Sequence, residues 1–414
     1  DSYFDRKSYF YPDSPRNFQI TQFYHPILKG GSITTRLGGE ERTFAISHTH
    51  LEDDAGMLKH FSHCGGVDYN RAGVPLLEIV SEPCFRCPKE ATAYVIALRA
   101  MLQYLDVSDG NMEEGSLRID TNVSVRIKGE QRLRNKVEIK NLNSFDFMEM
   151  GIEAEMRRQV RAYEKSPHLP PHQVLPASTV RLDVNRQETL VMREKEGADD
   201  YRYFPEPDLP PIYLTHEEVE SIRRELPELP HARYLRYTGS LGLTKDQADV
   251  LLSDPRWADH FDQALTHWDH PRAICNWIIG EWLGRFKERD RLLSKESLPP
   301  RDVAHLVELI DKGQITGRIA KEIADLMADN PGLSPEEAIA NNPHFVALTD
   351  SEAIDAIIEE VIAHHKQSAI DFCNGKEKAF NFLVGQVMKA SKGQASPNVA
   401  KERLREALQR GDWE

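Results

Sequence analysis

The stretch Leu117-Arg118-Ile119-Asp120-Thr121-Asn122-Val123-Ser124-Val125-Arg126-Ile127 alternates core-forming and polar residues over eleven positions. Because successive side chains of a β-strand point to opposite faces of its sheet, this period of two predicts a strand with one core face and one polar face. The run Val137-Glu138-Ile139-Lys140 repeats the pattern briefly. The two runs predict strands in this part of the chain.

The rest of the N-terminal half mixes short strand-like runs with turns and a few helices. An apolar run at 74–80 predicts a buried strand. A helical apolar periodicity follows Pro88, a residue favoured at the first helical position. Ser144 is a suitable N-cap for a second helix that runs to about Tyr163, and a proline-rich loop is expected at 165–178.

From residue 216 onward the sequence predicts helix after helix. The expected helices lie at 216–225, 244–252, 257–268, 271–288, 301–312, 316–328, 334–341, 350–365, 376–390 and 397–410. The change coincides with the proline-rich segment 205–211, which suits neither a helix nor a central strand. A second break at Asn341-Asn342-Pro343 separates two helical modules. These patterns predict an α+β chain in three parts, 1–215, 216–335 and 336–414.

The composition is that of a globular protein of a reducing compartment. The 414 residues suffice for two or three domains of roughly 100–200 residues each, and 40% are hydrophobic and 29% charged. No apolar run approaches the roughly 20 residues of a membrane-spanning helix, and the first residues do not form a signal or transit peptide. The five cysteines are scattered, which favours a reduced, cytoplasmic location without a membrane partner.

Charge is distributed unevenly along the chain. The formal net charge of −14 argues against a non-specific nucleic-acid coat, which would be basic throughout. Residues 376–410 nevertheless carry eight Lys or Arg against three Glu. This is either a solvated helical face or the local basic surface of a module that contacts nucleic acid.

The polar residues at alternate positions of 117–127 have the composition of a binding site. Asp120 and Asn122 are poor strand formers, so their presence in a strand calls for a reason. Arginines such as Arg118 fork onto phosphate oxygens, and carboxylates hold cations, so the set suits a phosphate-plus-metal site. A solvated sheet face is the alternative for an average strand.

Further carboxylates could complete such a site. Glu78 lies inside an apolar run, where an unpaired carboxylate is costly, so it needs a cation, a metal or a hydrogen-bond network as partner. Glu52-Asp53-Asp54 is a second acidic cluster. Separated carboxylates on short strands suit Mg²⁺, which prefers oxygen ligands. The sequence contains neither a P-loop nor a dinucleotide-binding glycine motif, so ATP would bind on a sheet surface.

Aromatic and cysteine motifs carry weaker signals. The segments 9–13 and 201–206 both join aromatic residues to Pro and an acid. They suit either packing at a domain edge or a wall against a nucleotide base. Cys84 and Cys87 with the cluster at 60–64 suggest a zinc site, but the spacing is too irregular for a zinc knuckle.

Long strings spread in order over the whole chain resemble the B subunit of aspartyl/glutamyl-tRNA amidotransferase, a tRNA-dependent enzyme. They lie at 5–13, 50–56, 68–83, 112–118, 138–145, 200–208, 382–389 and 391–395, and they include Asp68-Tyr69-Asn70-Arg71-Ala72-Gly73-Val74-Pro75-Leu76-Leu77-Glu78 and Tyr201-Arg202-Tyr203-Phe204-Pro205-Glu206. The resemblance implies a glutamine synthetase-like catalytic cradle at 1–215, with its N-terminal part missing. It also implies an all-α domain at 216–335 and a small helical, tRNA-binding tail at 336–414.

The resemblance also implies a reaction. Such an enzyme is a ligase that forms carbon–nitrogen bonds with glutamine as amido donor. The B subunit phosphorylates the side-chain carboxylate of mischarged Glu-tRNA(Gln) or Asp-tRNA(Asn) with ATP and Mg²⁺. Ammonia released by the partner A subunit, an amidase, then displaces the phosphate, and a small C subunit ties the other two together.

Site residues follow by position in the matching strings. The expected metal ligands are Asp53 and Glu78. The expected catalytic residues are Lys7, Arg118 and Lys140, which would neutralise phosphate charge, and Asp120, Asn122 and Glu138, which would shape the site. The expected nucleotide-binding residues are Lys7, Tyr11, Arg118 and Ser124.

The chain departs from the family pattern at three places. The family's opening strand carries a Glu-x-His pair that helps to hold Mg²⁺, and this chain starts after it. We therefore expect an N-terminally truncated form with weak or no catalysis. Asp53 stands where the family usually has Glu, which shortens its reach to a metal. Cys84 and Cys87 stand where the family tends to have Asp and Ser, which further disfavours zinc.

Two other functions are compatible with the residues alone. One is a tRNA-docking protein without chemistry, and the other is a free-standing carboxylate–amine ligase with its own ammonia supply. The sequence does not distinguish Asp-tRNA from Glu-tRNA as substrate.

Overall fold

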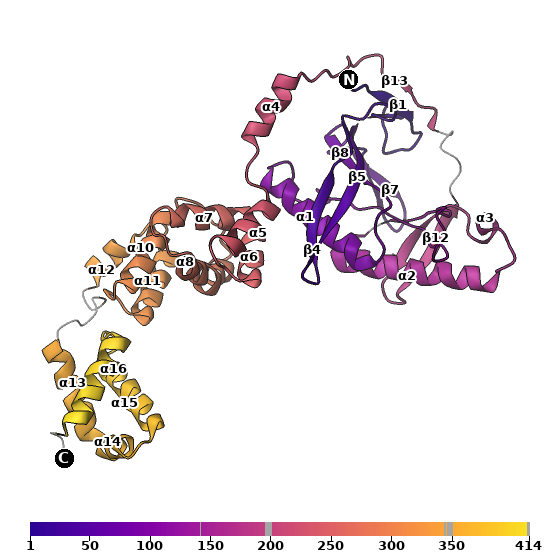
Figure 1. Ribbon diagram of the computed structural model, residues 1–414. Helices are drawn as coiled ribbons and strands as arrows, with labels where there is room; N and C mark the ends of the chain where they lie inside the picture. The colour runs from indigo at the N-terminus through magenta and orange to yellow at the C-terminus, as the bar shows by residue number, and fades with distance from the viewer. Residues whose placement is uncertain (141, 195–200, 343–344, 346–350, 412–414) are drawn as a thin grey trace. The chain divides into compact units, whose positions relative to one another are not determined.

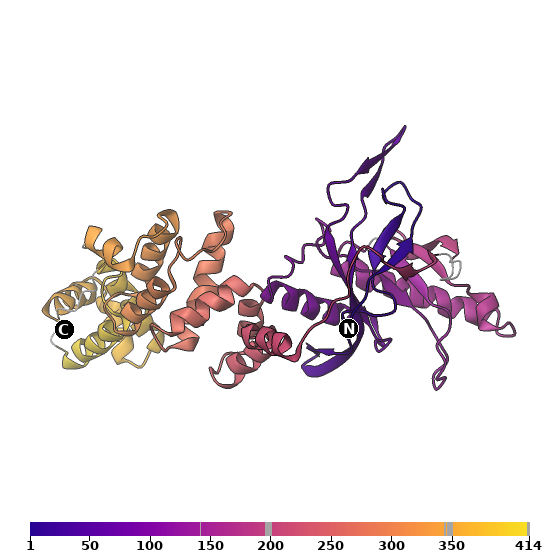
Figure 2. The same cartoon turned by 90° about the horizontal axis from the view of Figure 1, so that it is seen from above.

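The computed structural model describes residues 1–140, 142–194, 201–342, 345 and 351–411 (Figure 1). The chain divides into two compact units, Asp1–His231 and Ala232–Glu414. Strands and helices mix in the first unit, whereas the described part of the second is helical (Figure 2). The predicted α+β content is therefore confirmed, and the three-part division at 215/216 and 335/336 stays a prediction. Within the described residues, every helix is too short or too polar to span a bilayer.

The site of interest lies on the first two sheets of the N-terminal unit. In one sheet, β1 (Asp5–Ser8) lies between β13 (Phe204–Pro205) and β2 (Phe18–Thr21). In the other, the long β5 (Glu40–Asp53) pairs antiparallel with β3 (Leu28–Lys29), β4 (Ser32–Leu37) and β8 (Pro75–Ser81). The strand predicted at 74–80 is thus confirmed as β8, but its predicted burial was wrong, because every residue of β8 is exposed or half-buried. Pro205 sits on an edge strand, where a missing N–H group is tolerated.

The remaining strands form a hairpin and a mixed sheet. β6 (Met57–His60) and β7 (Gly65–Asp68) make the hairpin. The mixed sheet has the order β12 (Glu188–Glu194), β11 (Ser178–Asp183), β10 (Val137–Lys140), β9 (Thr121–Val123), and its β10–β11 pair is parallel. The brief alternation at 137–140 is confirmed as β10.

Residues 117–127 form a shorter strand than their alternating pattern predicts. Of residues 117–127, only β9 pairs in a sheet, and its three residues alternate buried, exposed, buried. Beyond it, the Val125 N–H donates to the buried Gln159 side chain at 2.9 Å instead of to a neighbouring strand. The Ser124 hydroxyl turns to a loop carbonyl at 2.9 Å. The eleven-residue strand was therefore wrong in length, because buried side chains replace the ladder, while the two-faced pattern is confirmed within β9.

Two helices share a core with the apolar face of the mixed sheet. They are α1 (Pro88–Tyr104) and α2 (Phe145–Lys165), and both were predicted. Helix α2 packs directly on the strands of this sheet, and α1 packs on α2 and β4. Ser144 caps α2 by accepting from the Phe147 N–H at 3.1 Å. Their apolar faces share one core with the inward side chains of β9, β10 and β11, among them Val123, Ile139 and Val180. The polar face of the sheet is left on the opposite side.

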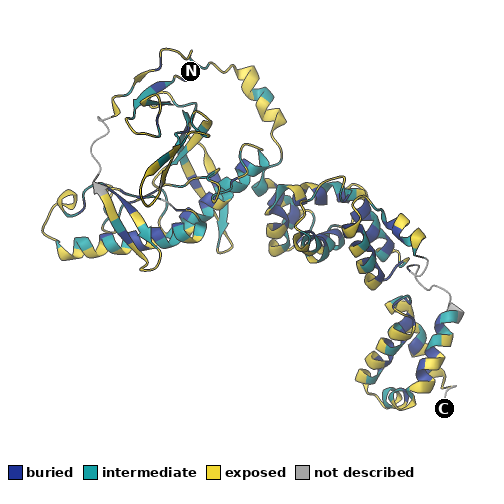
Figure 3. Ribbon diagram, turned by 180° about the vertical axis from the view of Figure 1, so that it is seen from behind, coloured by how far each residue is buried: buried dark blue, intermediate teal, exposed yellow. Residues whose placement is uncertain are grey.

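The other elements within the described residues are helices. They are α3 (Pro171–Val174), α4 (His216–Glu225), α5 (Pro230–Gly239), α6 (Lys245–Leu252), α7 (Pro255–Leu265), α8 (Pro271–Trp277), the π-helical η2 (Ile278–Trp282), α9 (Leu283–Glu288), α10 (Pro300–Asp311), α11 (Gly317–Asp329), α12 (Pro335–Asn341), α13 (Ser351–His364), α14 (Lys366–Cys373), α15 (Glu377–Ala390) and α16 (Pro397–Arg410). The helices predicted from residue 216 onward are confirmed within a few residues at their ends, with η2 interrupting the one expected at 271–288. The sequence did not predict α3, α5 and α14, which are short. α4 has no buried residue (Figure 3), whereas α13 to α16 enclose a hydrophobic core of their own.

Candidate active site

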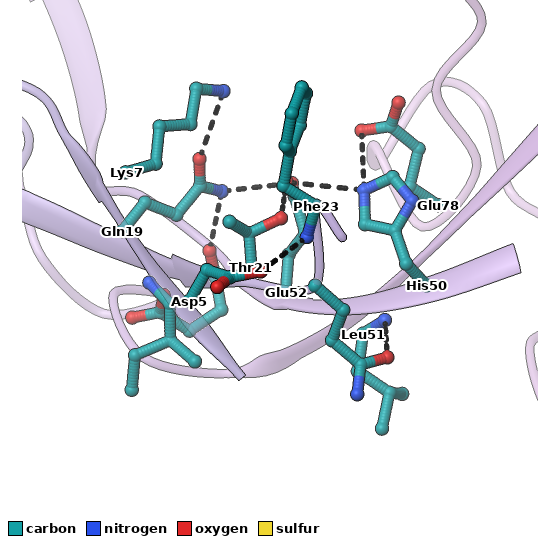
Figure 4. A network of polar contacts seen from close by, with 12 residues as sticks. Asp5, Lys7, Gln19, Thr21, Phe23, His50, Leu51, Glu52 and Glu78 are labelled. Carbon is teal, nitrogen blue, oxygen red and sulfur yellow. Dashed lines mark hydrogen bonds and ion pairs between the residues drawn. The ribbon is translucent and has the colours of Figure 1, made fainter. Parts of the chain in front are cut away.

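Three potential ligand side chains converge on one face of β5 and β8. His50 and Glu52 alternate along β5, and the antiparallel register places Glu78 of β8 opposite His50. The His50 Nε2 atom lies 3.4 Å from Glu52 Oε1 and 3.7 Å from Glu78 Oε2. One ligand atom from each residue lies within 4.8 Å of the other two (Figure 4). We call His50, Glu52 and Glu78 the carboxylate–histidine group.

Electrostatics set the two carboxylates apart. Burial and the charge of Glu52 together raise the pKa of Glu78. Burial also acts against ionisation of Glu52, but the His50 hydrogen bond and the nearby Lys7 charge outweigh it and lower the pKa of Glu52. The Glu52 side chain is 7% exposed and that of Glu78 is 52% exposed, so solvent screens the repulsion between them only in part.

The group fits a divalent cation. Two carboxylates and an imidazole are ordinary ligands for such ions, and a bound cation would relieve the repulsion between Glu52 and Glu78. The buried Nδ1 atom of His50 has no hydrogen-bond partner, whereas Nε2 faces the carboxylates. Within the described residues, the set of three His, Cys, Asp or Glu side chains whose ligand atoms lie within 4.8 Å of one another is this group. It contains no cysteine.

Strands β1 and β2 hold Glu52 from the other side. Thr21 Oγ1 donates to Glu52 Oε1 at 2.9 Å, and Gln19 Nε2 donates to Glu52 Oε2 at 3.0 Å. Lys7 Nζ donates in turn to Gln19 Oε1 at 3.4 Å. The Lys7 ammonium also lies 4.9 Å from the ring centroid of Tyr201. Glu52 is therefore fixed in place with a cationic side chain beside it (Figure 4).

The polar face of the mixed sheet adds a second cation. The Lys140 Nζ atom lies 2.5 Å from Asp120 Oδ2 and 3.0 Å from Glu138 Oε1. Burial disfavours the charged amine, yet these two carboxylates outweigh it and raise the pKa of Lys140. Asn122 stands opposite Glu138 in the register. Because the Asp120 charge also contributes to the raised pKa of Glu78, this face lies within electrostatic reach of the carboxylate–histidine group.

An aromatic ring borders the site. Tyr203 stacks on Phe23 with ring centroids 4.1 Å apart. Burial, the neighbouring Tyr201 and the charges of Glu52 and Glu78 raise the pKa of Tyr203 to about 12. Tyr203 is thus a neutral phenol within electrostatic reach of the two carboxylates. Whether segment 201–206 forms a wall against a base or packs at a domain edge stays a prediction.

The chain matches proteins of known family. Residues 1–220 match the model of the GatB/GatE catalytic domain, and residues 259–408 match that of the GatB domain. The B subunit of the aspartyl/glutamyl-tRNA(Asn/Gln) amidotransferase of Protochlamydia amoebophila is 54% identical over 407 residues, which cover 98% of this chain and 82% of the relative. Its counterpart of the same name from Chlamydia pneumoniae is 52% identical over 410 residues, 99% of this chain and 84% of the relative.

This chain belongs to the GatB family of amidotransferase B subunits. The resemblance noted in the sequence strings is thereby confirmed. The family match covers the strands that carry the carboxylate–histidine group, so this member of the GatB family brings that group into its catalytic-domain region.

Two residues of this GatB family member that were predicted to belong to the site, Asp53 and Arg118, lie outside the carboxylate–histidine group. Asp53 follows Glu52 on β5 and so points to the other side, where it pairs with Arg16 and accepts from the Ile20 N–H at 2.7 Å. Arg118 pairs with the buried Asp54. Their carboxylate and guanidinium groups already have partners, so the structure does not bring them to His50.

Two expected nucleotide-binding residues also have local partners. The Ser124 hydroxyl donates to the Arg134 carbonyl at 2.9 Å. Tyr11 stacks on Tyr9 with ring centroids 4.7 Å apart. By contrast, the structure brings Lys7, Glu78, Asp120, Asn122, Glu138 and Lys140 to the two faces described above.

Sequence reasoning missed His50 and Glu52 as members of the site. The acidic run 52–54 drew attention to Asp53, but a strand directs neighbouring residues to opposite faces. The alternation of side chains along a strand could have identified them, since His48, His50 and Glu52 share one face of β5. A strand that runs from residue 40 to residue 53 would have placed Glu52, and not Asp53, beside His50.

Proposed function

We propose that the carboxylate–histidine group and the polar face around Lys140 form the site where this GatB family member activates a side-chain carboxylate. The family acts in tRNA-dependent amidation, and the chain is accordingly one component of a glutamine-hydrolysing carbon–nitrogen ligase. The proposed substrate is the carboxylate of a mischarged Glu-tRNA(Gln) or Asp-tRNA(Asn). The proposed co-substrate is ATP with Mg²⁺.

The observation that carries the proposal is the placement of anions and cations. Glu52 and Glu78 with His50 would hold Mg²⁺, which when bound neutralises phosphate charge and orients the phosphates. Lys7 and Lys140 supply two separate cations, one beside Glu52 and one on the polar face of the mixed sheet. Transfer of a phosphoryl group depends mainly on such positioning and charge neutralisation.

The chain's own side chains then have distinct tasks. Lys140 neutralises charge on the transferred phosphoryl group, while Asp120 and Glu138 hold its ammonium in position. Asn122 offers an exposed amide on the same face. Lys7, held by Gln19, stands beside Glu52 and serves the phosphates of ATP. The Tyr203 hydroxyl remains protonated at neutral pH and can donate a hydrogen bond at the edge of the site.

The proposed chemistry needs an activated acyl group because a carboxylate is a poor acyl donor. A side-chain carboxylate oxygen attacks the γ-phosphorus, the bond to the β,γ-bridging oxygen breaks, and ADP leaves. Ammonia then attacks the acyl carbon, phosphate leaves with the former carboxylate oxygen, and the nitrogen loses one proton to give the amide. The product is Gln-tRNA(Gln) or Asn-tRNA(Asn).

The partners and architecture are part of the proposal. Ammonia would come from an amidase partner, the A subunit, and a small C subunit would join the complex. We also propose a glutamine synthetase-like cradle at 1–215, a helical domain at 216–335 and a tRNA-binding tail at 336–414. The excess of Lys and Arg at 376–410, on α15, α16 and their connection, supports the last assignment. A cytoplasmic location follows from the proposed substrate.

The remaining predicted residues keep smaller proposed roles. Arg118, through Asp54, would position the loop before β9 beside the site. Asp53 would order β2 through Arg16 and the Ile20 N–H, on the side of β5 opposite to Glu52. Tyr11 and Ser124 would act at the border of the nucleotide.

Amidation by the complex assembled with the complete B subunit tests the proposal. Glu52→Gln should reduce the rate of ATP-dependent amidation by at least about 100-fold, since it removes a fixed anion at the reacting centre. Glu113→Gln, on an exposed loop, is the matched control and should keep the wild-type rate. Wild-type-like amidation by Glu52→Gln would rule out this site, and a complex with no Mg²⁺-dependent ATP binding by calorimetry would instead indicate a docking role for this chain.

A further inference from the structure

A small pocket lies beside the carboxylate–histidine group, at the preceding positions of β5. It has a volume of about 270 Å³ and is lined by Phe23, Tyr24, Pro26, Lys29, Ser47 and His48. His48 precedes His50 by two residues on β5, and their rings stack with centroids 5.3 Å apart. Phe23 is also the residue on which Tyr203 stacks. The pocket therefore adjoins the proposed reacting centre.

Exposed aromatic rings form one wall of this pocket. The side chains of Phe23 and Tyr24 are about half exposed, at 51% and 56%, and their rings meet edge to face at 4.9 Å. Large exposed rings add nothing to a hydrophobic core, but they offer flat apolar surfaces on which a base can stack. Figure 4 shows Phe23 on the same side of the ribbon as His50 and Glu78.

The loop that carries these rings is fixed from beneath. The buried Asp5 carboxylate accepts from the Phe23 N–H at 2.9 Å and from the Tyr24 N–H at 3.2 Å. The buried Gln22 side chain accepts from the Ile27 N–H at 3.2 Å and from the Leu51 N–H at 3.0 Å. Buried polar groups thus hold exposed rings in one arrangement, and such preorganisation lowers the entropic cost of binding a flat ligand.

Polar groups complete the pocket. Lys29 supplies a cation suited to a phosphate. Ser47 Oγ and His48 Nδ1 lie 3.3 Å apart and supply donors and acceptors for a base edge or a ribose hydroxyl. The volume lies just below the range of about 300–1,000 Å³ typical of sites for drug-sized ligands, so it suits one nucleoside and not a dinucleotide.

We propose that this pocket binds an adenine nucleoside, with the base on Tyr24 and the adjoining phosphate at Lys29. The assignment rests on the proposed function, which supplies two adenine nucleosides next to the reacting centre. They are the nucleoside of ATP and the terminal adenosine of the aminoacyl-tRNA. The chemistry of recognition is the same for both, and the experiment separates them.

The test compares Tyr24→Ala and Tyr24→Phe in the assembled complex. Loss of the ring should raise one KM about tenfold with kcat changed less than about threefold, as expected for loss of one stacked base. Tyr24→Phe keeps the ring and should keep the wild-type KM. Phe61→Ala, which removes an exposed ring in the β6–β7 turn, is the control and should change neither constant.

The affected substrate identifies the nucleoside. A raised KM for ATP alone assigns the pocket to ATP, and a raised KM for aminoacyl-tRNA alone assigns it to the tRNA terminus. Titration of the chain by itself with AMP, followed by calorimetry, gives a readout independent of amidation, and Tyr24→Ala should weaken AMP binding about tenfold. If both KM values and AMP binding are unaffected by Tyr24→Ala, the nucleoside pocket is refuted. If wild type does not amidate but binds AMP through Tyr24, the proposed function fails and the pocket stands.

Discussion

Replacement of Glu78 by Gln should separate the role of the carboxylate–histidine group from a role in folding. The substitution removes one of two carboxylates whose ligand atoms lie within 4.8 Å of each other. Coulomb's law gives a repulsion of about 1 kcal/mol at this separation in water and about 3 kcal/mol at an effective dielectric constant near 20. Because the Glu78 side chain is half exposed, we take the lower figure.

Without divalent cations, Glu78→Gln should therefore stabilise the N-terminal unit. An increase of about 1 kcal/mol corresponds to a rise in Tm of about 2–4 °C for a unit of this size. With Mg²⁺ present, the order should reverse, because the wild-type group gains binding free energy that the variant loses. The same substitution should lower ATP-dependent amidation at least about 100-fold.

Calorimetry with and without Mg²⁺ measures the effect, and the chain provides an internal control. All five Trp residues follow residue 250, so Trp fluorescence reports the C-terminal unit and should not change. Glu113→Gln removes an exposed carboxylate and should change neither stability nor its dependence on Mg²⁺. A Glu78→Gln variant that is less stable than wild type in the absence of divalent cations, or a wild type that Mg²⁺ does not stabilise, would refute the reasoning.

Four further outcomes follow from the same contacts. Lys140→Met should reduce amidation about 100-fold or more and lower stability modestly, since Asp120 is half exposed but Glu138 is largely buried and loses its cation; an unchanged kcat would remove Lys140 from the site. The raised pKa of Glu78 means that the folded state binds a proton more tightly than the unfolded state, so its contribution to stability is full below pH 4.5 and is lost as pH rises through the raised value. Urea titrations of wild type and Glu78→Gln between pH 4 and 7 should show this fall in wild type only, and parallel curves would contradict it. Gln159→Leu should cost about 1–3 kcal/mol, because the Val125 N–H loses a buried acceptor; a urea midpoint like that of wild type would show that the amide finds another partner. Ser334→Ala removes the capping box of α12 and should cost about 1 kcal/mol of the C-terminal unit, measured by Trp fluorescence, whereas Ser334→Asp should restore most of it.

Much of the secondary structure could be predicted from local patterns. Helices with a clear start, such as α2 behind Ser144 and α12 behind Ser334, begin where their caps indicate. The length of β9 could not be predicted in this way. Its hydrogen bonds end because the side chain of Gln159, on a helix distant in sequence, takes the Val125 amide, and no local pattern reports such a contact.

The site was predicted in part for the same reason. The polar face with Asp120 and Lys140 was visible in two short alternating runs. The carboxylate–histidine group depends on the pairing of β5 with β8, which sets Glu78 opposite His50. That register is a long-range property of the fold. The full length of β5 had to be known before Glu52 could be chosen as the site residue over its neighbour Asp53.

We propose that this site activates a carboxylate as an acyl phosphate. The most direct test of this claim uses mischarged tRNA whose side-chain carboxylate carries heavy oxygen, with ATP, Mg²⁺, glutamine and the assembled complex. Mass spectrometry of the inorganic phosphate should find one labelled oxygen for each amide formed, and the Glu52→Gln complex should form neither product at an appreciable rate. Amidation without label in the phosphate, or full label transfer by Glu52→Gln, would contradict the claim.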